Sequence, residues 1–229
     1  MKKKTKKKIT LNENWHKTAY RIHPMKKKTK KITAAELMAK LNADPKFVAE
    51  RDAEEAVRLV RVEALRVEVG PLLDELRAVG CSVSSASDLM KPPYPDAAPW
   101  PASIPVLLGH IQRDGYSADA RELLARALAV PEAKSGWNVL TRLFQEEQAK
   151  APKDGLAAAI AAAADDEVIG EVIALARDTR HGSSRLLLLS ALERSGDARA
   201  REALMDLSTD PDLTKEIQVI LRRLKRAKR

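Results

Sequence analysis

Leucine, alanine, isoleucine and valine recur at helical spacing through residues 102–229. The apolar positions fall three or four residues apart, as on one face of an α-helix, and polar or Gly/Pro joints separate successive faces. The equivalent positions Leu107, Leu140, Ile173 and Leu204 are 33, 33 and 31 residues apart. A period near thirty residues with two helices in each is typical of a helical-repeat array. We therefore expect four helix pairs, with apolar faces over residues 104–111, 120–130, 137–144, 156–163, 168–176, 186–192, 200–207 and 213–224.

Two helix-start signals organise the beginning of the patterned region. Thr33 and Glu36 form a capping box, in which the Thr hydroxyl accepts a hydrogen bond from the amide three residues on and the Glu carboxylate reaches back. Asp44 and Pro45 then predict an N-cap followed by the first residue of a second helix. That helix continues to Val69, and its many charges predict a long, exposed amphipathic helix with apolar residues at Val48, Ala56, Leu59, Val60, Val62 and Leu65.

A third N-terminal helix is expected from Pro71 to Gly80, since Pro favours a first helical turn and Gly a helix end. Residues 81–101 interrupt the pattern with closely spaced prolines and predict an ordered loop, after which Pro105 is expected to start a helix. The predicted organisation has four parts: a Lys-rich flexible tail (1–32), an N-terminal helical cap that shields the first repeat (33–80), a Pro-rich loop (81–101) and the repeats (102–229). The fold class is all-α.

Positive charge is concentrated in residues 1–32, which contain 12 Lys and Arg21 against the single acid Glu13 and so carry +12. The whole chain carries +9, so residues 33–229 carry −3. The segment Met1–Thr10 recurs almost unchanged as Met25–Thr33, which suggests a second start, a duplication or a dispensable extension. Like-charged runs stay disordered. The tail is predicted to be either a solubilising extension or an arm that binds RNA, DNA or another anionic surface.

Several segments resemble known repeats. Residues 184–192 (SRLLLLSAL), 196–200 (GDARA) and 210–213 (DPDL) look like consecutive HEAT repeats. Residues 104–108 (IPVLL) and 121–128 (RELLARAL) are similar to bacterial HEAT-repeat proteins of uncharacterised role. The resemblance covers about residues 102–224. It implies an α-solenoid of HEAT-like helix pairs with extended binding surfaces, and it implies little about the particular function.

No residue pattern in the chain predicts catalysis. The sequence has no Gly-rich phosphate loop after a strand, no nucleophile elbow and no metal-spaced His/Cys set, so we expect neither enzymatic activity nor a cofactor. Cys81 is the single cysteine, which rules out a disulfide framework within one chain. The longest apolar run of the C-terminal half, residues 156–164, is too short to span a membrane, and no secretory signal is recognisable. A cytoplasmic location without membrane insertion is the default.

Charged residues near the starts of the second helices are the first candidates for binding. Arg121, Asp154, Arg185 and Lys215 could form a ridge that contacts carboxylates or phosphates of a partner, or a ladder that ties neighbouring repeats together. Both alternatives remain open from the sequence. Arg180 and His181 precede Arg185 in one turn and join the candidates for partner binding.

Aromatic and acidic residues supply the remaining candidates. Tyr94 and Trp100 lie in the Pro-rich segment and are predicted partner contacts, because Tyr and Trp are enriched at interface hot spots. Trp137 opens a helix on its apolar face and is predicted to pack in the core. The acids of residues 165–167 precede a helix, and capping explains them without any catalytic role.

Two functions from different classes are compatible with this sequence. The leading hypothesis is a non-enzymatic scaffold or adaptor that binds a protein partner on the repeat surface. The alternative is a nucleic-acid-binding protein, in which the Lys-rich tail or the arginine ridge contacts phosphates. HEAT-like alkylpurine DNA glycosylases act on DNA with a related architecture, which predicts a basic concave face with aromatics beside an acid. The −3 charge and few aromatics of the body disfavour that analogy, and no residue can be carried over from those enzymes.

Overall fold

The computed structural model describes residues 32–90 and 100–227, and this part of the chain is all-α, with no strand. Its α-helices are α1 (Ala34–Asn42), α2 (Pro45–Glu68), α3 (Gly70–Ala78), α4 (Trp100–Ile111), α5 (Ala118–Ala127), α6 (Trp137–Glu146), α7 (Lys150–Ala163), α8 (Ile169–Arg177), α9 (Arg185–Arg194), α10 (Ala198–Asp206) and α11 (Thr214–Ala227). Four 3₁₀ helices, η1 (Ala86–Met90), η2 (Pro131–Gly136), η3 (Thr179–Ser184) and η4 (Leu207–Thr209), lie between them. Residues 1–31 of the predicted tail lie outside the described residues.

The chain divides into two compact units, residues 1–53 and 54–229, and the division falls within α2. In the first unit the predicted helix starts are confirmed. The Thr33 hydroxyl accepts a hydrogen bond from the Glu36 amide at 3.2 Å, and the Glu36 carboxylate accepts one from the Thr33 amide at 2.8 Å. Asp44 accepts a hydrogen bond from the Lys46 amide at 3.0 Å at the start of α2. Helix α1 has no buried residue.

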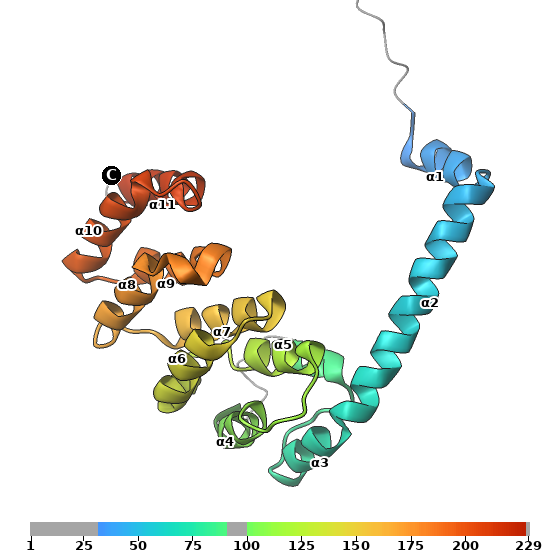
Figure 1. Cartoon of the computed structure of the whole chain (residues 1–229), viewed down its shortest axis with the longest axis horizontal. Helices are drawn as coiled ribbons and strands as arrows, with labels where there is room; N and C mark the ends of the chain where they lie inside the picture. Colours follow the sequence, from blue (N-terminus) through green and yellow to red (C-terminus); the bar gives the residue numbers. More distant parts are fainter. Residues whose placement is uncertain (1–31, 91–99, 228–229) are drawn as a thin grey trace, which may run out of the picture. The chain divides into compact units, whose positions relative to one another are not determined.

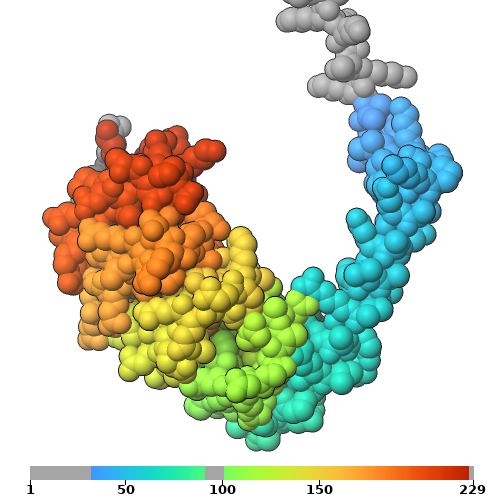
Figure 2. Space-filling model, viewed as in Figure 1, coloured from blue at the N-terminus to red at the C-terminus, as the bar shows by residue number. Residues whose placement is uncertain are grey.

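Consecutive helices of the second unit contact one another in pairs: α4 with α5, α6 with α7, α8 with α9, and α10 with α11 (Figure 1). The second helices of successive pairs also contact each other, in the order α5, α7, α9 and α11. In the space-filling view the pairs form bands that follow the order of the sequence (Figure 2). The regularly spaced positions Leu107, Leu140, Ile173 and Leu204 are all buried, one in the first helix of each pair.

Helix α7 is rich in alanine and contacts both α5 and α9. A Cβ atom added at Gly155 would lie 2.9 Å from Ala125 Cβ, closer than real carbon atoms approach. Small side chains on α7 therefore let the second helices approach closely, and four of its alanines are buried: Ala157, Ala159, Ala161 and Ala163. On the next second helix, Leu188 and Leu192 are buried, as their spacing of four residues predicts.

Part of the predicted cap of residues 33–80 contacts the first helix pair. Helix α3 contacts α4, and η1 contacts α5. Leu72, Leu76 and Leu89 are buried there. Helix α1 and the beginning of α2 belong to the other unit.

Two boundaries around the Pro-rich segment differ from expectation. The predicted loop of residues 81–101 contains the 3₁₀ helix η1, because Asp88 accepts hydrogen bonds from the amides of Ser84 and Ser85 and so closes a turn. Pro105 was expected to start a helix but lies inside α4, which already begins at Trp100. Pro105 is the sixth residue of α4 and lies beyond the first four amides, which have no intrahelical partner, so α4 lacks one backbone hydrogen bond at this position.

Candidate functional site

The predicted ridge of charged residues forms contacts between neighbouring helix pairs. Arg121 Nε on α5 donates to Glu147 Oε2 at 2.9 Å. Asp154 Oδ1 on α7 accepts from Ser184 Oγ at 2.6 Å. Each contact joins the first turn or two of one second helix to the connection inside the next pair. Lys215 on α11 is exposed.

Arg185 makes the corresponding contact on α9 and is almost wholly buried, with 1% of its surface exposed. Its Nη1 donates to Asp210 Oδ2 at 2.6 Å, and its Nε donates to the Gly182 carbonyl oxygen at 3.0 Å. The hydrogen bond from Arg185 holds the pKa of Asp210 below the usual range. These contacts match the ladder alternative, because a buried guanidinium that is already paired offers no open surface to a partner.

The acidic and aromatic candidates also make links between pairs. Lys134 in η2 forms ion pairs with Asp165 and Glu167, and Ser195 Oγ donates to Asp166 Oδ1 at 2.5 Å. Trp137 is buried in the core, as predicted, and its Nε1 donates to Glu171 Oε2 at 2.8 Å. Of the two predicted aromatic contacts, Tyr94 lies outside the described residues. Trp100 begins α4, and its side chain also lies outside the described part.

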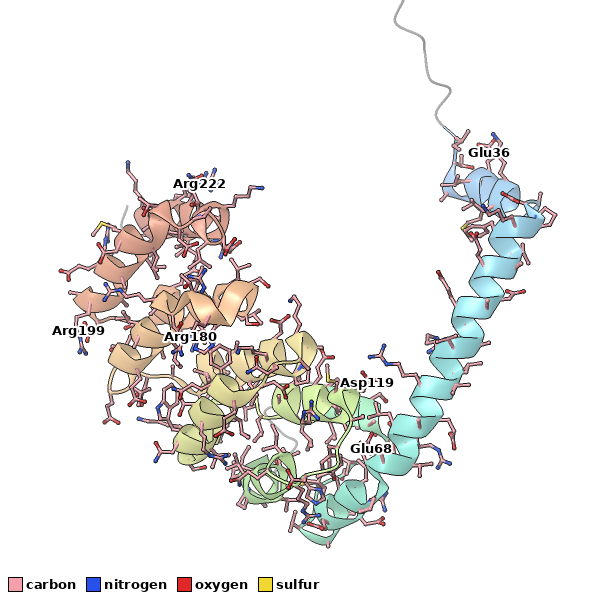
Figure 3. The ribbon with its side chains drawn as sticks, viewed as in Figure 1. Glu36, Glu68, Asp119, Arg180, Arg199 and Arg222 are labelled. Carbon is pink, nitrogen blue, oxygen red and sulfur yellow. The ribbon has the colours of Figure 1, made fainter. Side chains whose placement is uncertain are left out.

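Arg180 and His181 lie close in sequence to Arg185 but have different surroundings. Arg180 is exposed, and its Nη2 donates to Asp178 Oδ2 at 2.6 Å. The same pairing occurs between Arg199 and Asp197 on α10, and Figure 3 labels both arginines. His181 is buried, with 7% of its surface exposed, and lines a cavity of about 480 Å³ between the second and third helix pairs. The structure therefore brings His181 and Arg180 to one cavity and places Arg185 in the ladder.

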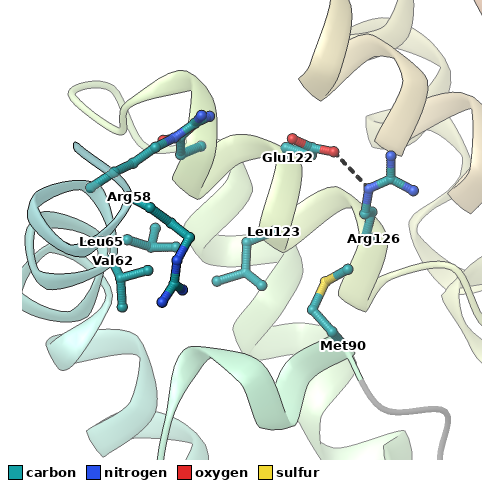
Figure 4. A pocket seen from close by; sticks show the side chains of 9 residues that line it. Arg58, Val62, Leu65, Met90, Glu122, Leu123 and Arg126 are labelled. Carbon is teal, nitrogen blue, oxygen red and sulfur yellow. Dashed lines mark hydrogen bonds and ion pairs between the residues drawn. The ribbon is translucent and has the colours of Figure 1, made fainter. Parts of the chain in front are cut away.

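A second concave site, an open groove of about 270 Å³, lies between the C-terminal half of α2 and α5 (Figure 4). Its apolar side chains come from three elements: Val62 and Leu65 from α2, Met90 from η1 and Leu123 from α5. Val62 and Met90 are each 51% exposed, which is unusual for side chains of this type beside a core. The groove is thus apolar in its middle and open to solvent.

Charged side chains form the rim of this groove. Arg61 on α2 is paired with Asp119 on α5, which fixes the two helices against each other. Arg126 Nε donates to Glu122 Oε1 at 2.8 Å, and Arg58 on the opposite side pairs with Glu55. The lining holds three arginines and two acids, Asp119 and Glu122, and the acid that pairs with Arg58 lies just outside the lining.

Sequence reasoning did not identify this groove or the role of Lys153. The helical spacing placed Val62 and Leu65 on an apolar face, but Met90 and Leu123 come from segments 28 and 61 residues beyond Val62. Lys153 follows Pro152 in the first turn of α7 and looked like an ordinary polar residue. No local pattern distinguishes it from its exposed neighbour Lys150.

Comparisons of the chain with protein-family models, with curated proteins and with solved structures find no match. Within residues 32–90 and 100–227, no group of three or more His, Cys, Asp or Glu side chains is arranged to hold a metal ion. None of the helices in the same ranges is long and apolar enough to cross a membrane.

Proposed function

We propose that the protein is a non-enzymatic scaffold in the cytoplasm that binds a protein partner, and that its helix pairs form an α-solenoid of HEAT-like repeats. The pairing of consecutive helices and the contacts among α5, α7, α9 and α11 support the solenoid. Repeat arrays of this kind expose extended surfaces that bind proteins without any cofactor. The groove between α2 and α5 is the observation that carries the proposal.

The groove fits a protein partner better than a small ligand. At about 270 Å³ it is slightly below the range of small-molecule pockets, which begins at roughly 300 Å³. An apolar centre within a charged rim is the arrangement of an interface hot spot, where one large side chain inserts and polar contacts surround it. The three arginines favour a partner segment that carries acids beside its apolar anchor.

The proposed occupant is therefore an acidic protein segment that inserts a large apolar side chain between Val62 and Met90. Val62→Glu introduces a charge into the centre of the groove. Because Val62 is half exposed, the substitution leaves the core intact, and the melting temperature is expected to change little. Binding of the partner is expected to weaken by about tenfold or more, since an apolar anchor would then face a carboxylate.

Val60→Glu is the matched control, because Val60 is 72% exposed on the same helix and does not line the groove. The partner is first captured from the native host by full-length protein after nuclease treatment, then identified and purified, and its affinity is measured for wild type and both variants. Selective loss with Val62→Glu supports the groove. Equal loss with both variants would assign binding to the wider surface of α2, and no loss with either would contradict the proposal.

Nucleic-acid binding remains the second candidate function because of the +12 charge of residues 1–32. The −3 charge of residues 33–229 and the burial of Arg185 favour the tail over the arginine ridge for this candidate. Nuclease treatment separates the two candidates in the capture experiment, since a partner held through nucleic acid would be lost.

A further inference from the structure

The cavity between the second and third helix pairs contains a histidine without hydrogen-bond partners. Neither ring nitrogen of His181 is hydrogen-bonded to any described residue. The nearest carboxylate oxygen is Asp178 Oδ2, at 3.6 Å from Nε2, which is beyond hydrogen-bond distance. A buried polar group without a partner is energetically costly, so such a group in a cavity indicates a position where another molecule can bind.

Packing fixes the orientation of the His181 ring. The ring lies against Phe144 with centroids 4.4 Å apart. The preceding segment is held by Asp178, which accepts a hydrogen bond from the Arg180 amide at 3.0 Å. Gly182 follows with φ +55°, a conformation that side-chain-bearing residues rarely adopt, and lets the chain turn into α9. The imidazole is therefore presented to the cavity by a well-packed turn.

Lys153 adds a buried positive charge to the same cavity. Its side chain is almost wholly buried, with Nζ 2.9 Å from the Glu147 carbonyl oxygen and 5.3 Å from the centre of the Phe144 ring. An ammonium group has three N–H donors, and the Glu147 carbonyl accepts one of them. Burial lowers the pKa of Lys153. Burial also lowers the pKa of His181, and the nearby positive charge of Lys153 lowers it further.

The charges around the cavity leave a positive excess. Arg180 and Lys153 are opposed by Asp178, whose carboxylate is already bound to Arg180 through both oxygens. With His181 neutral, the lining carries one net positive charge, so a single negative charge would neutralise it. The remaining lining is uncharged and consists of Gln145, Gln148, Ala174 and Leu175.

We propose that this cavity binds a carboxylate group, which accepts hydrogen bonds from Lys153 Nζ and from a ring N–H of His181. A carboxylate supplies the acceptors that both side chains lack, and its single charge matches the single excess charge. With His181 neutral, a phosphate dianion would leave the partly buried cavity with a net negative charge. The apolar wall of Ala174 and Leu175 then contacts the carbon chain that bears the carboxylate.

Two sources of this chemistry are compatible with a cavity of about 480 Å³, which lies within the size range of ligand pockets. One is the acidic side chain of a protein segment, and the other is a small free carboxylic acid. The site lies on other helices than the groove of Val62, so the proposal stands or falls independently of that groove.

The test follows the imidazole resonances of His181 in the full-length protein, with ¹³C-labelled histidine, during titration with four compounds. N-acetylglutamate N-methylamide represents an acidic side chain, and succinate represents a small acid. N-acetylglutamine N-methylamide is the neutral control, and inorganic phosphate tests the anion class. We expect saturable shifts with the two carboxylates and none with the neutral amide. Preference for the glutamate compound indicates a protein segment, and preference for succinate indicates a small acid.

Lys153→Met tests the partner group, because Met fills nearly the same volume without the charge. Its carboxylate affinity is expected to fall about tenfold or more, the effect of losing a charge-assisted hydrogen bond. Lys150→Met, one turn earlier on α7 and exposed, is the matched control and should bind as wild type does. His181→Phe keeps the contact with Phe144 and should also bind weakly, and thermal melting establishes that each variant is folded.

The pH dependence supplies a second readout. A bound carboxylate stabilises protonated His181 and raises its pKa, so binding takes up a proton and the affinity should rise as the pH falls through that raised pKa. The charged groups around the ring are Lys153 on α7, Asp178 and Arg180 in the turn before His181, and Arg185 on α9. Equal shifts with the neutral amide, tighter binding of phosphate than of either carboxylate, or unchanged affinity in Lys153→Met would each overturn the proposal.

Discussion

Individual polar residues in this protein behave according to their partners rather than their sequence neighbours. Arg180 and Arg185 lie five positions apart, yet one is exposed and the other is almost wholly buried. Asp210 compensates the charge of Arg185, whereas His181 between them has no hydrogen-bond partner in the described structure. A buried charge needs such compensation, and a buried imidazole without it indicates an available binding position.

The core on α9 provides a prediction at the residue scale. Leu188 is fully buried, and Leu188→Ala is expected to lower the free energy of unfolding by about 2–5 kcal/mol, because a cavity forms where the side chain was. The adjacent Leu187 is 37% exposed, and Leu187→Ala should cost clearly less. Chemical denaturation of both variants measures the difference. Equal losses would show that the two leucines are assigned to the wrong faces.

At the scale of elements, the helix pairs are held together by two kinds of contact. Small and branched apolar side chains pack α5, α7 and α9 against one another. Polar contacts then link each pair to the next, through Arg121 with Glu147, Asp154 with Ser184, and Arg185 with Asp210. Apolar packing supplies most of the stabilisation, and the directional polar links fix which turn of one helix faces which connection of the next pair.

The buried link between α9 and the last pair predicts a pH-dependent stability. Arg185→Gln removes the charge that pairs with Asp210 and is expected to cost about 2 kcal/mol at pH 7. Because the folded-state pKa of Asp210 lies below its usual value of 3.8, the stabilisation is complete above that pH and is lost as the pH falls through the folded-state pKa. The difference in melting temperature between wild type and variant should therefore shrink in acid.

Arg199→Gln is the control for this experiment, because Arg199 is exposed and pairs with Asp197 two residues away within the same helix start. Its loss should lower the melting temperature much less at pH 7. If Arg185→Gln melts like Arg199→Gln at every pH, the buried pair makes no net contribution and the ladder is not a stabilising element.

At the scale of the whole chain, charge and apolar surface are unevenly distributed. Residues 1–32 hold the entire positive excess, whereas the described helices carry the groove, the cavity and the ladder. The exposed valines of α2, Val57, Val60 and Val67, are a further apolar surface in the second unit. Binding of anionic polymers and binding of proteins are therefore expected at different parts of the chain.

Deletion of residues 1–32 tests this division. The helical content and melting temperature of the remainder should stay essentially unchanged, because residues 1–32 have no hydrophobic period with which to pack on it. Affinity for nucleic acid should largely disappear, and the affinity of the full-length chain should fall steeply between about 50 and 200 mM salt, since lysine–phosphate contacts release counterions. Equal, salt-insensitive binding by both forms would place a nucleic-acid site on the helices.

Features that depend only on residues close together in the chain could be predicted from the sequence. Capping at Thr33 and Asp44 needs groups within three positions, and the helix pairs follow from apolar spacing along each segment, so both could be predicted. The start of α4 was misplaced and η1 was not predicted, because proline and serine signals are compatible with several short-range conformations. The period of the helix pairs was predicted from the spacing of four apolar positions, all of which are buried: Leu107, Leu140, Ile173 and Leu204.

The candidate sites could not be predicted from the sequence, because folding brings their residues together from distant positions. Arg185 and Asp210 are 25 residues apart, and Arg61 and Asp119 are 58 apart. Whether an arginine is a free surface group or a buried link depends on what the next helix pair places beside it. Sequence patterns along one helix carry no information about that neighbour, so the choice between ridge and ladder, the groove and the unpaired His181 became visible only once the pairs were packed.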